Sequence, residues 1–294
     1  MSIHEECGVF GVYSPEQTDV ASTTYYGLFA LQHRGQESCG IVVNNNCVFK
    51  TYKEAGLVND VFTKDALNKL GLGNMALGHV RYGSVKTVGD ENTLPLVVNY
   101  SQGSLAISYN GTLTNADELR KELEMKGLIF HTKSDTEVIA YLITRERVTS
   151  ESIEEAISKA MEKLEGAYSF IVMSPRKLMA VRDKRGMKPL CYGTTPDGRY
   201  IVASESCALD SVGAKLEREV KPGEIIVIEN ASTDGSMDII RECQTRFENL
   251  HVIVNETNLG FAPAVNQGIR MSKAEYVVMF NNDAFAQPVS ATVK

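Results

Sequence analysis

The chain has 294 residues, of which 43% are apolar, and its 30 Lys and Arg residues against 37 Asp and Glu residues give a formal net charge of -7. This balance is typical of a soluble globular protein and argues against a fibrous or disordered chain. The acidic excess also argues against nucleic acid and an anionic membrane surface as partners. The length allows one large domain or two smaller ones.

The first residues lack a cationic segment followed by an apolar run, so we expect no secretory signal and a cytoplasmic location. The longest apolar runs are far shorter than a membrane span. The six cysteines form no CxxC pair and no paired Cys/His spacing, which argues against a zinc site or a disulfide framework. Most of them should be small buried residues, with one candidate reactive thiol.

Two kinds of local signal alternate along the first 229 residues. β-Branched runs predict strands over residues 8–13, 40–43, 75–80, 104–109, 169–173, 178–182, 200–203 and 224–228. Capping boxes predict helix starts at Asn115, Ser134 and Ser152, and glycines predict helix ends at residues 35, 127 and 166. Because strands come in runs with helices grouped between them, we predict layered sheets with helices outside, an α+β fold.

The pattern changes after Glu229. A turn and helix entry over 230–236, a strand over 251–255, a helix over 263–271 and a strand over 275–280 indicate α/β alternation. The chain stops at Lys294 with nothing left to complete a sheet. We therefore expect a second, incomplete α/β unit over residues 230–294, joined to the first unit at a strand.

Several polar clusters fall at the ends of the predicted elements. Cys7 precedes an apolar strand with two glycines, and polar runs occupy residues 31–37, 78–82, 109–111 and 134–137. Element ends on a rigid scaffold are where functional sites are built. Taken singly, each cluster has a structural explanation: a buried strand cysteine, a solvated cation at Arg81, a type I′ hairpin turn at Asn110-Gly111, and a carboxylate complementing a helix dipole at Asp135. For Asn110-Gly111 the turn is the favoured interpretation on local grounds.

Taken together and in order, these motifs resemble the glutaminase domain of class II glutamine amidotransferases, the N-terminal-nucleophile (Ntn) group. The matching runs are Glu5–Gly11, Gly27–Ser38, Gly78–Tyr82, Asn110-Gly111, Ser134–Val138, Lys188–Leu190, Ala203–Cys207 and Pro222–Glu224. The run from Leu31 to Gly35 favours the amidophosphoribosyltransferase branch over the fructose-6-phosphate and asparagine branches. The resemblance covers residues 7–229 and implies a four-layer α/β/β/α sandwich that hydrolyses glutamine to glutamate and ammonia for phosphoribosylamine formation in purine synthesis.

The resemblance makes Cys7 the nucleophile, assisted by its own α-amino group. An α-amine with a pKa of about 7.7 to 8.0 can take the thiol proton, whereas a peptide nitrogen cannot. Residues 1–6 are therefore expected to be a propeptide, cleaved between Glu6 and Cys7.

The remaining site residues are also implied by the resemblance. Asn110 and Gly111 would form the oxyanion hole, Arg81 and the hydroxyl of Ser84 would bind the substrate carboxylate, and Asp135 would bind its ammonium group. His33 and His79 are taken as structural, and Cys39, Cys47, Cys191 and Cys207 as core residues. No cofactor is expected for this domain, glutamine is the expected small-molecule partner, and a homo-oligomer is compatible with the sequence. The phosphoribosyl-binding half of the family is expected to be absent, since no Asp-Asp dipeptide occurs in the chain.

The last part of the chain, about residues 224–294, resembles a family 2 glycosyltransferase of the GT-A fold. The motifs are Glu224–Ser236, Asn258–Ala262, Asn266–Gly268 and Phe280–Asp283. The resemblance implies that Glu229 contacts a nucleobase and that Asp283 is a ligand of a divalent metal, Mg²⁺ or Mn²⁺. Local alternatives are a strand-end carboxylate and a turn residue. We expect a fragment without transferase activity, although nucleotide-sugar transfer by this segment is the alternative function. The two resemblances overlap at the strand 224–229, expected to be the last strand of the first unit and an early strand of the second.

Overall fold

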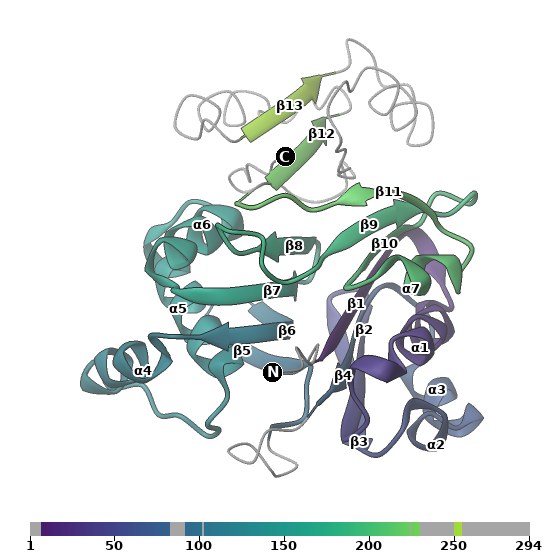
Figure 1. The fold of residues 1–294 in the computed structure, drawn as a ribbon, viewed down its shortest axis with the longest axis horizontal. Coiled ribbons are helices and arrows are strands. Elements are labelled where there is room, and N and C mark those ends of the chain that lie inside the picture. Colours follow the sequence, from purple (N-terminus) through teal and green to yellow (C-terminus); the bar gives the residue numbers. More distant parts are fainter. Residues whose placement is uncertain (1–6, 83–91, 102, 224, 230–249, 255–294) are drawn as a thin grey trace.

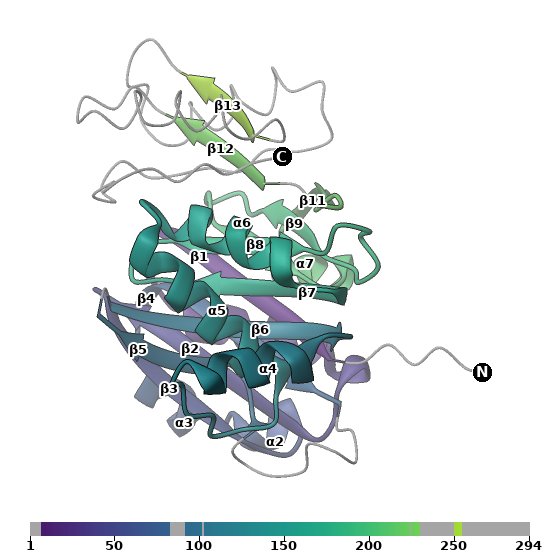
Figure 2. The same ribbon diagram turned by 90° about the vertical axis from the view of Figure 1, so that its left-hand side faces the viewer.

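Two antiparallel sheets lie face to face at the centre of the molecule, and helices cover both outer faces (Figures 1 and 2). The computed structural model describes residues 7–82, 92–101, 103–223, 225–229 and 250–254. The arrangement is the predicted four-layer α/β/β/α sandwich. The predicted α+β class is therefore confirmed.

The larger sheet has seven strands, and its order places β1 beside β4 near the middle. In spatial order the strands are β11 (Lys215–Glu219), β9 (Cys191–Thr194), β10 (Tyr200–Ala203), β1 (Gly8–Thr18), β4 (Gly73–Arg81), β2 (Ser38–Asn45) and β3 (Val48–Ala55). The antiparallel register pairs Gly8 with Val80. This register brings the residue before β1, Cys7, to the end of β4, where Arg81 lies.

The smaller sheet has four strands in sequence order: β5 (Leu96–Tyr100), β6 (Gly103–Leu113), β7 (Gly166–Met173) and β8 (Leu178–Arg182). Its inner face packs on the larger sheet through an apolar layer that includes Val9, Leu77, Ala106 and Ile171. Gly11 permits this close packing, because a Cβ atom there would lie 3.1 Å from Leu178 and 3.3 Å from Ile171.

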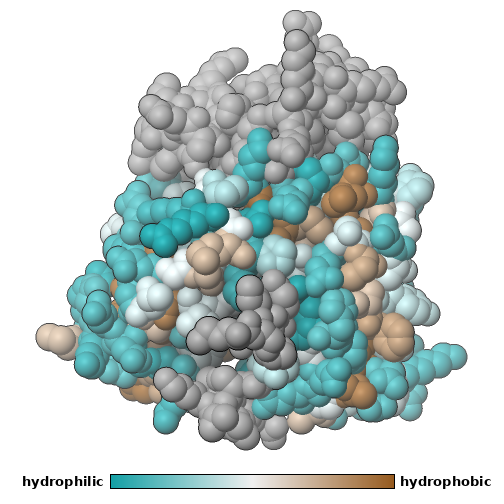
Figure 3. Space-filling view, viewed as in Figure 1, coloured by the Kyte–Doolittle hydropathy of each residue, from teal (hydrophilic) through white to brown (hydrophobic). Residues whose placement is uncertain are grey.

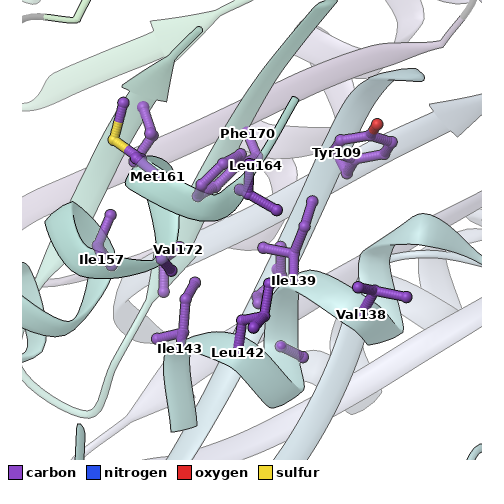
Figure 4. Close-up of a cluster of buried hydrophobic side chains, with 14 of the residues drawn as sticks. Tyr109, Val138, Ile139, Leu142, Ile143, Ile157, Met161, Leu164, Phe170 and Val172 are labelled. Carbon is purple, nitrogen blue, oxygen red and sulfur yellow. The ribbon is translucent and has the colours of Figure 1, made fainter. Parts of the chain in front are cut away.

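Each sheet has its own layer of helices. The smaller sheet is covered by α4 (Ala116–Met125), α5 (Asp135–Thr149) and α6 (Ile153–Lys163), and the larger sheet by α1 (Val20–Ala30), the 3-10 helix η1 (Gln32–Arg34), α2 (Val58–Val61), α3 (Lys64–Leu70) and α7 (Ser206–Asp210). Figure 4 shows Ile139, Leu142 and Ile143 of α5 in one cluster with Phe170 and Val172 of β7. These side chains are at most 1% exposed, so α5 is held firmly against the sheet.

The three predicted helix starts are correct, but the capping contacts differ. Ser152 accepts from the backbone N–H of Glu155, as in a capping box. Glu137 instead accepts from the N–H groups of His131 and Thr132, and the Asn115 side chain bonds residues at the end of α6. Of the predicted helix-ending glycines, residue 127 follows α4, whereas Gly166 begins β7 and Gly35 has an extended backbone.

The sequence pattern did not predict four short or exposed strands, β3, β5, β9 and β11. The turn between β2 and β3 consists of Asn46 and Cys47, both with positive φ, so that the two strands pair directly at Asn45 and Val48. Cys47 is therefore exposed, and its prediction as a core residue is wrong. Cys39 and Cys191 are buried as predicted, and Cys207 is half-buried.

Beyond the sandwich, β12 (Ile225–Glu229) pairs in parallel with β13 (Leu250–Val254). The two strands form a sheet of their own, and β12 belongs to neither sheet of the sandwich. The expectation that this strand ends the first unit is therefore wrong. The strand predicted near residue 251 is confirmed, while Asp283 lies outside the described residues. None of the helices in the described ranges is long and apolar enough to cross a membrane.

Candidate active site

A pocket of about 1220 Å³ brings together side chains that are far apart in the sequence. Cys7, Arg81, Gly111 and Asp135 all line it, and they come from the start of β1, the end of β4, the end of β6 and the start of α5. Four of the six residues predicted for the glutaminase site therefore share one cavity. Ser84 lies outside the described residues, and Asn110 is buried immediately beside the pocket-lining Gly111.

The backbone of Cys7 is fixed on both sides of its Cα atom. Its N–H donates to the carbonyl of Arg34 over 3.0 Å, and Arg34 Nε donates to the Cys7 carbonyl over 2.8 Å. The Arg34 side chain is only 1% exposed and also forms an ion pair with Glu205. These contacts hold Cys7 at a φ of 63°, a left-handed conformation that is uncommon for a residue other than glycine. Such strained residues cluster at functional sites.

Asn110 and Gly111 lie inside β6, paired with Ser169 and Tyr168 of β7. The hairpin-turn interpretation of this dipeptide is therefore wrong, because the strand continues through both residues. Gly111 has a φ of 151°, and a Cβ atom there would lie 2.2 Å from the carbonyl oxygen of Ala167. The glycine is thus required by the close approach of β7 and not by a turn.

The side chain of Asn110 is completely buried, and neither its oxygen nor its nitrogen has a hydrogen-bond partner. Two residues earlier on β6, Ser108 donates to the Gly78 carbonyl of β4, so strand alternation also directs Asn110 toward the space between the sheets. A buried polar group without a partner costs about 1 to 3 kcal/mol. Such a group calls for an explanation, and a ligand that completes its hydrogen bonds is one.

Arg81 and Asp135 bring opposite charges into the same pocket. Arg81 is 6% exposed at the end of β4. Asp135 occupies the first turn of α5, where its Oδ2 accepts from the Leu113 N–H over 2.9 Å and from the Tyr109 hydroxyl over 3.4 Å. Burial raises the pKa of the Asp135 carboxyl, and these hydrogen bonds oppose the rise. A ligand with a carboxylate and an ammonium group would match this pair.

Two pocket residues that position Asp135 or the loop before it were not predicted from the sequence. Tyr109 contacts Asp135, and burial raises its pKa well above the ordinary value, so its hydroxyl stays protonated and available as a donor. Arg120 donates to the carbonyls of Thr132 and Ser134 and lies 4.1 Å above the Phe130 ring, which fixes the loop before α5. The signal for Tyr109 was its place beside Asn110. Arg120 sits on an ordinary charged helix face and has no such signal.

The two histidines that were predicted to be structural lie in different surroundings. His79 is fully buried, its Nε2 donates to the Tyr109 carbonyl over 3.0 Å, and burial lowers its pKa to about 3. It therefore links β4 to β6 as a neutral side chain. His33 is exposed and contacts Glu205 outside the pocket. Among the described residues, the group of His, Cys and carboxylate donors close enough to share a metal ion also lies there, away from Cys7.

Comparison with known proteins shows what the sandwich is similar to. A family model described as a glutamine amidotransferase domain matches residues 84–211. The chain is 48% identical over 224 residues to the amidophosphoribosyltransferase of Methanocaldococcus jannaschii, covering 76% of this chain and 47% of that protein. It is 43% identical over 227 residues to the Bacillus subtilis enzyme of the same name, covering 77% and 46%. The chain thus spans about half the length of the curated relatives it matches.

Solved structures show a similarity over the same part of the chain. The glutamine phosphoribosylpyrophosphate amidotransferase of B. subtilis in complex with ADP and GMP superimposes with a TM-score of 0.68 at 43% identity, over 74% of this chain and 46% of that one. A second family model, glycosyl transferase family 2, matches residues 208–291. That match is weak and does not confirm the predicted fragment, and most of its range lies outside the described residues.

Proposed function

Because this chain carries a glutamine amidotransferase domain homologous to that of amidophosphoribosyltransferases, we propose that it hydrolyses glutamine to glutamate and ammonia with Cys7 as the nucleophile. The observation that carries the proposal is the single pocket lined by Cys7, Arg81, Gly111 and Asp135. These residues supply a thiol, a cation, backbone next to a buried amide, and a carboxylate.

In the proposed reaction, glutamine binds through its two charged ends. The Arg81 guanidinium takes the α-carboxylate and Asp135 takes the α-ammonium group, while Arg120 and Tyr109 keep Asp135 in position. This arrangement points the side-chain amide toward Cys7. Holding both charged groups of the substrate converts the attack into an effectively intramolecular step, which lowers the barrier.

The Cys7 sulfur then forms a bond to the amide carbon, and the electron pair of the carbonyl moves onto oxygen. Asn110 Nδ2 and the Gly111 N–H would donate to this oxyanion, and the unpartnered state of the Asn110 amide supports that role. The thiol proton passes through the α-amine of Cys7 to the leaving nitrogen, and ammonia departs. Water next hydrolyses the thioester, which releases glutamate and restores the thiol.

This proton transfer needs a free α-amine on Cys7, so the proposal includes removal of residues 1–6. A glutamine analogue with an electrophile in place of the side-chain amide tests it directly. We expect the analogue to modify Cys7 in chains that begin at Cys7, as read by intact mass and peptide mapping, with loss of glutaminase activity. Chains that begin at Cys7 but neither react nor release glutamate from glutamine would refute the proposal. Exposed Cys47 is the internal control for non-specific thiol labelling.

We further propose that the ammonia serves phosphoribosylamine formation, the reaction that the relatives' name describes. The support is the identity of 48% and 43% to two amidophosphoribosyltransferases over the same region. The test is to add a separately produced phosphoribosyl-binding half of such a relative. Glutamine-dependent phosphoribosylamine formation, absent with either protein alone, is the expected result.

For the C-terminal segment we propose descent from a family 2 glycosyltransferase, with Asp283 as a ligand for Mg²⁺ or Mn²⁺. The match to residues 208–291 supports this proposal, as does the parallel pairing of β12 with β13, which is usual in α/β folds. Manganese-dependent binding of a nucleoside diphosphate sugar, lost in Asp283→Ala, is the test. Equal binding by both proteins would remove Asp283 from the proposed site.

A further inference from the structure

A cluster of three different metal-binding side chains lies outside the pocket, between η1 and the start of α7. It consists of His33, Glu205 and Cys207, whose Nε2, carboxylate oxygen and Sγ atoms all lie within 4.8 Å of one another. His33 belongs to η1, Glu205 is the N-cap residue of α7, and Cys207 lies in its first turn. His33 and Glu205 are 172 positions apart in the sequence, so the fold creates the cluster.

From this geometry we propose that His33, Glu205 and Cys207 form a binding site for Zn²⁺. One imidazole, one carboxylate and one thiolate are the ligand types that Zn²⁺ takes, and water would fill the fourth position. Mg²⁺ and Ca²⁺ prefer oxygen ligands alone, so the nitrogen and sulfur donors select against them. The spacing of the cysteines in the sequence gave no sign of this site, because its ligands come from distant segments.

The distances already approach those of a tetrahedral zinc site. His33 Nε2 lies 3.0 Å and Cys207 Sγ 3.6 Å from the same oxygen, Glu205 Oε2. Zinc bond lengths of about 2.0 to 2.3 Å place neighbouring tetrahedral ligands roughly 3.3 to 3.6 Å apart. Two of the three donor separations are thus close to tetrahedral spacing, and the third, between His33 Nε2 and Cys207 Sγ, is at most 4.8 Å.

The two oxygens of the Glu205 carboxylate have different partners. Its Oε1 accepts from Arg34, and its Oε2 faces His33 and Cys207. A second contact of this kind fixes the orientation of a ligating carboxylate, as is common around metal sites. The Arg34 charge opposes a cation, so we expect weaker binding than at a site with three uncompensated ligands.

The site is open to solvent and can load without unfolding. The His33 side chain is 56% exposed and that of Glu205 is 33% exposed. Binding replaces the proton on Cys207 Sγ with the metal, and the proton passes to the buffer. Without metal, burial and the adjacent Glu205 charge raise the pKa of this thiol and keep it protonated.

An occupied site would tie η1 to α7. η1 also contains Arg34, which contacts both the N–H and the carbonyl of the Cys7 peptide backbone. Zinc would therefore brace the segment that holds the candidate nucleophile. The metal-binding proposal does not depend on glutaminase activity, because its readouts are affinity and thiol protection.

The test is a zinc titration of the full chain after metal removal, in competition with a chromophoric chelator. We expect one Zn²⁺ per chain, with the affinity reduced about tenfold or more in both His33→Ala and Cys207→Ser. Cys47→Ser, Cys7→Ala and His131→Ala serve as matched controls and should leave the affinity unchanged. Circular dichroism without zinc checks that all variants fold. Unchanged affinity in His33→Ala and Cys207→Ser, or no saturable binding, would overturn the proposal.

A second measurement reports on the site directly and survives any loss of stability in the variants. In the unmodified chain, Zn²⁺ should protect Cys207 from alkylation by iodoacetamide, as read by peptide mass, while Mg²⁺ should not. In His33→Ala the protection should disappear at the same zinc concentration. Protection that persists without His33, or that Mg²⁺ provides equally, would show that the three side chains do not act together on zinc.

Discussion

The two sheets of the sandwich contribute to the pocket in different ways. The seven-stranded sheet supplies Cys7 and Arg81 from strand ends, and the buried Arg34 side chain, paired with the partly exposed Glu205, fixes the Cys7 backbone. The four-stranded sheet supplies Gly111 from within β6, and beside it lies Asn110, whose buried amide has no partner. On the larger sheet, the backbone of Cys7 is thus already hydrogen-bonded in the free protein, whereas on the smaller sheet the Asn110 amide has no hydrogen-bond partner.

This difference suggests a division of work. The larger sheet holds its reactive group in a fixed, hydrogen-bonded conformation, which favours precise attack. On the smaller sheet the buried Asn110 amide has no partner, which costs stability in the free protein. In the proposed reaction this amide would donate to the substrate oxygen, which would offset that cost as charge develops there. We therefore expect Cys7→Ala and Asn110→Leu both to reduce activity but to differ in stability, with little change in the first variant and a gain in the second.

The largest effect is expected at the nucleophile. Cys7→Ala removes the sulfur that forms the thioester, and glutamate release should fall by at least about a thousandfold in chains that begin at residue 7. The free energy of unfolding should change little, because the contacts of Cys7 with Arg34 use only backbone atoms of residue 7. Cys47→Ser, at an exposed turn, should keep full activity. Retained glutaminase activity in Cys7→Ala would show that Cys7, at the start of β1, is not the nucleophile.

Asn110→Leu tests the other side of the pocket. Leucine has nearly the same shape as asparagine but cannot donate, so kcat should fall by about 100- to 1000-fold with little change in KM. The free energy of unfolding should rise by about 1 to 3 kcal/mol, because the variant no longer buries an amide without partners. Chemical denaturation and steady-state kinetics measure the two quantities.

Asn44→Leu is the matched control for that change. Asn44 is also completely buried in a strand, and its Oδ1 also has no partner, but its Nδ2 donates to the Pro175 carbonyl over 2.8 Å. Leucine there leaves this carbonyl without its donor, so the protein should lose stability and keep its kcat. If Asn110→Leu instead destabilises as Asn44→Leu does, the Asn110 amide has a structural role.

Gly111→Ala should act mainly on folding. A Cβ atom would lie 2.2 Å from the Ala167 carbonyl oxygen, and φ at this position is 151°, so we expect a loss of about 2 to 4 kcal/mol in the free energy of unfolding. Gly127 also has a positive φ, 88°, but no atom lies within 4 Å of the new Cβ, so Gly127→Ala should cost about 1 kcal/mol. Equal losses in the two variants would show that the approach of β7 to β6 is not what requires the glycine.

The sequence predicts the larger sheet's contribution better than the smaller sheet's. The apolar runs that become β1 and β4 end at Cys7 and Arg81, so local pattern and motif both place these residues at strand ends. For Asn110-Gly111 the local preference is a turn, and only pairing with β7, some sixty residues later, keeps the dipeptide extended. Long-range contact overrides local propensity here: the resemblance to the family motif predicted a site role for the dipeptide, whereas local reasoning alone predicted a turn.

The same limit explains the other errors. Cys47 was predicted to be a core residue because free cysteines are mostly buried, but the register of β2 and β3 places it in a two-residue turn. The strand at residues 225–229 reads as part of the sandwich, yet its partner is β13. The His33–Glu205–Cys207 cluster depends on η1 meeting α7, which no spacing within the sequence encodes. In each case the missing information is which segments become neighbours.

The smallest effect is expected at Asp135, and it separates binding from folding on the side of the smaller sheet. Asp135→Asn keeps an oxygen that can accept from the Leu113 N–H but loses the charge that would bind the substrate ammonium group. KM for glutamine should rise about 10- to 100-fold, the effect of one or two hydrogen bonds to a charged group, while kcat changes less.

Although Asp135→Asn should bind glutamine more weakly, it should not lose stability, and this follows from the raised pKa of the Asp135 carboxyl. A raised folded-state pKa adds stability below the unfolded-state pKa, and this contribution is lost as the pH rises through the folded-state value. Above that pH the ionised carboxylate therefore destabilises the folded state, and the asparagine variant should be at least as stable as the unmodified protein.

The pH dependence of KM then distinguishes a binding role from a structural one. As the pH falls through the raised pKa of Asp135, the unmodified protein should lose the carboxylate and its KM should increase, whereas KM of Asp135→Asn should stay nearly constant over that range. Parallel pH profiles for the two proteins would place the ammonium-binding group elsewhere in the pocket. The smaller sheet would then contribute only to the oxyanion, and the larger sheet would have to recognise both ends of the substrate.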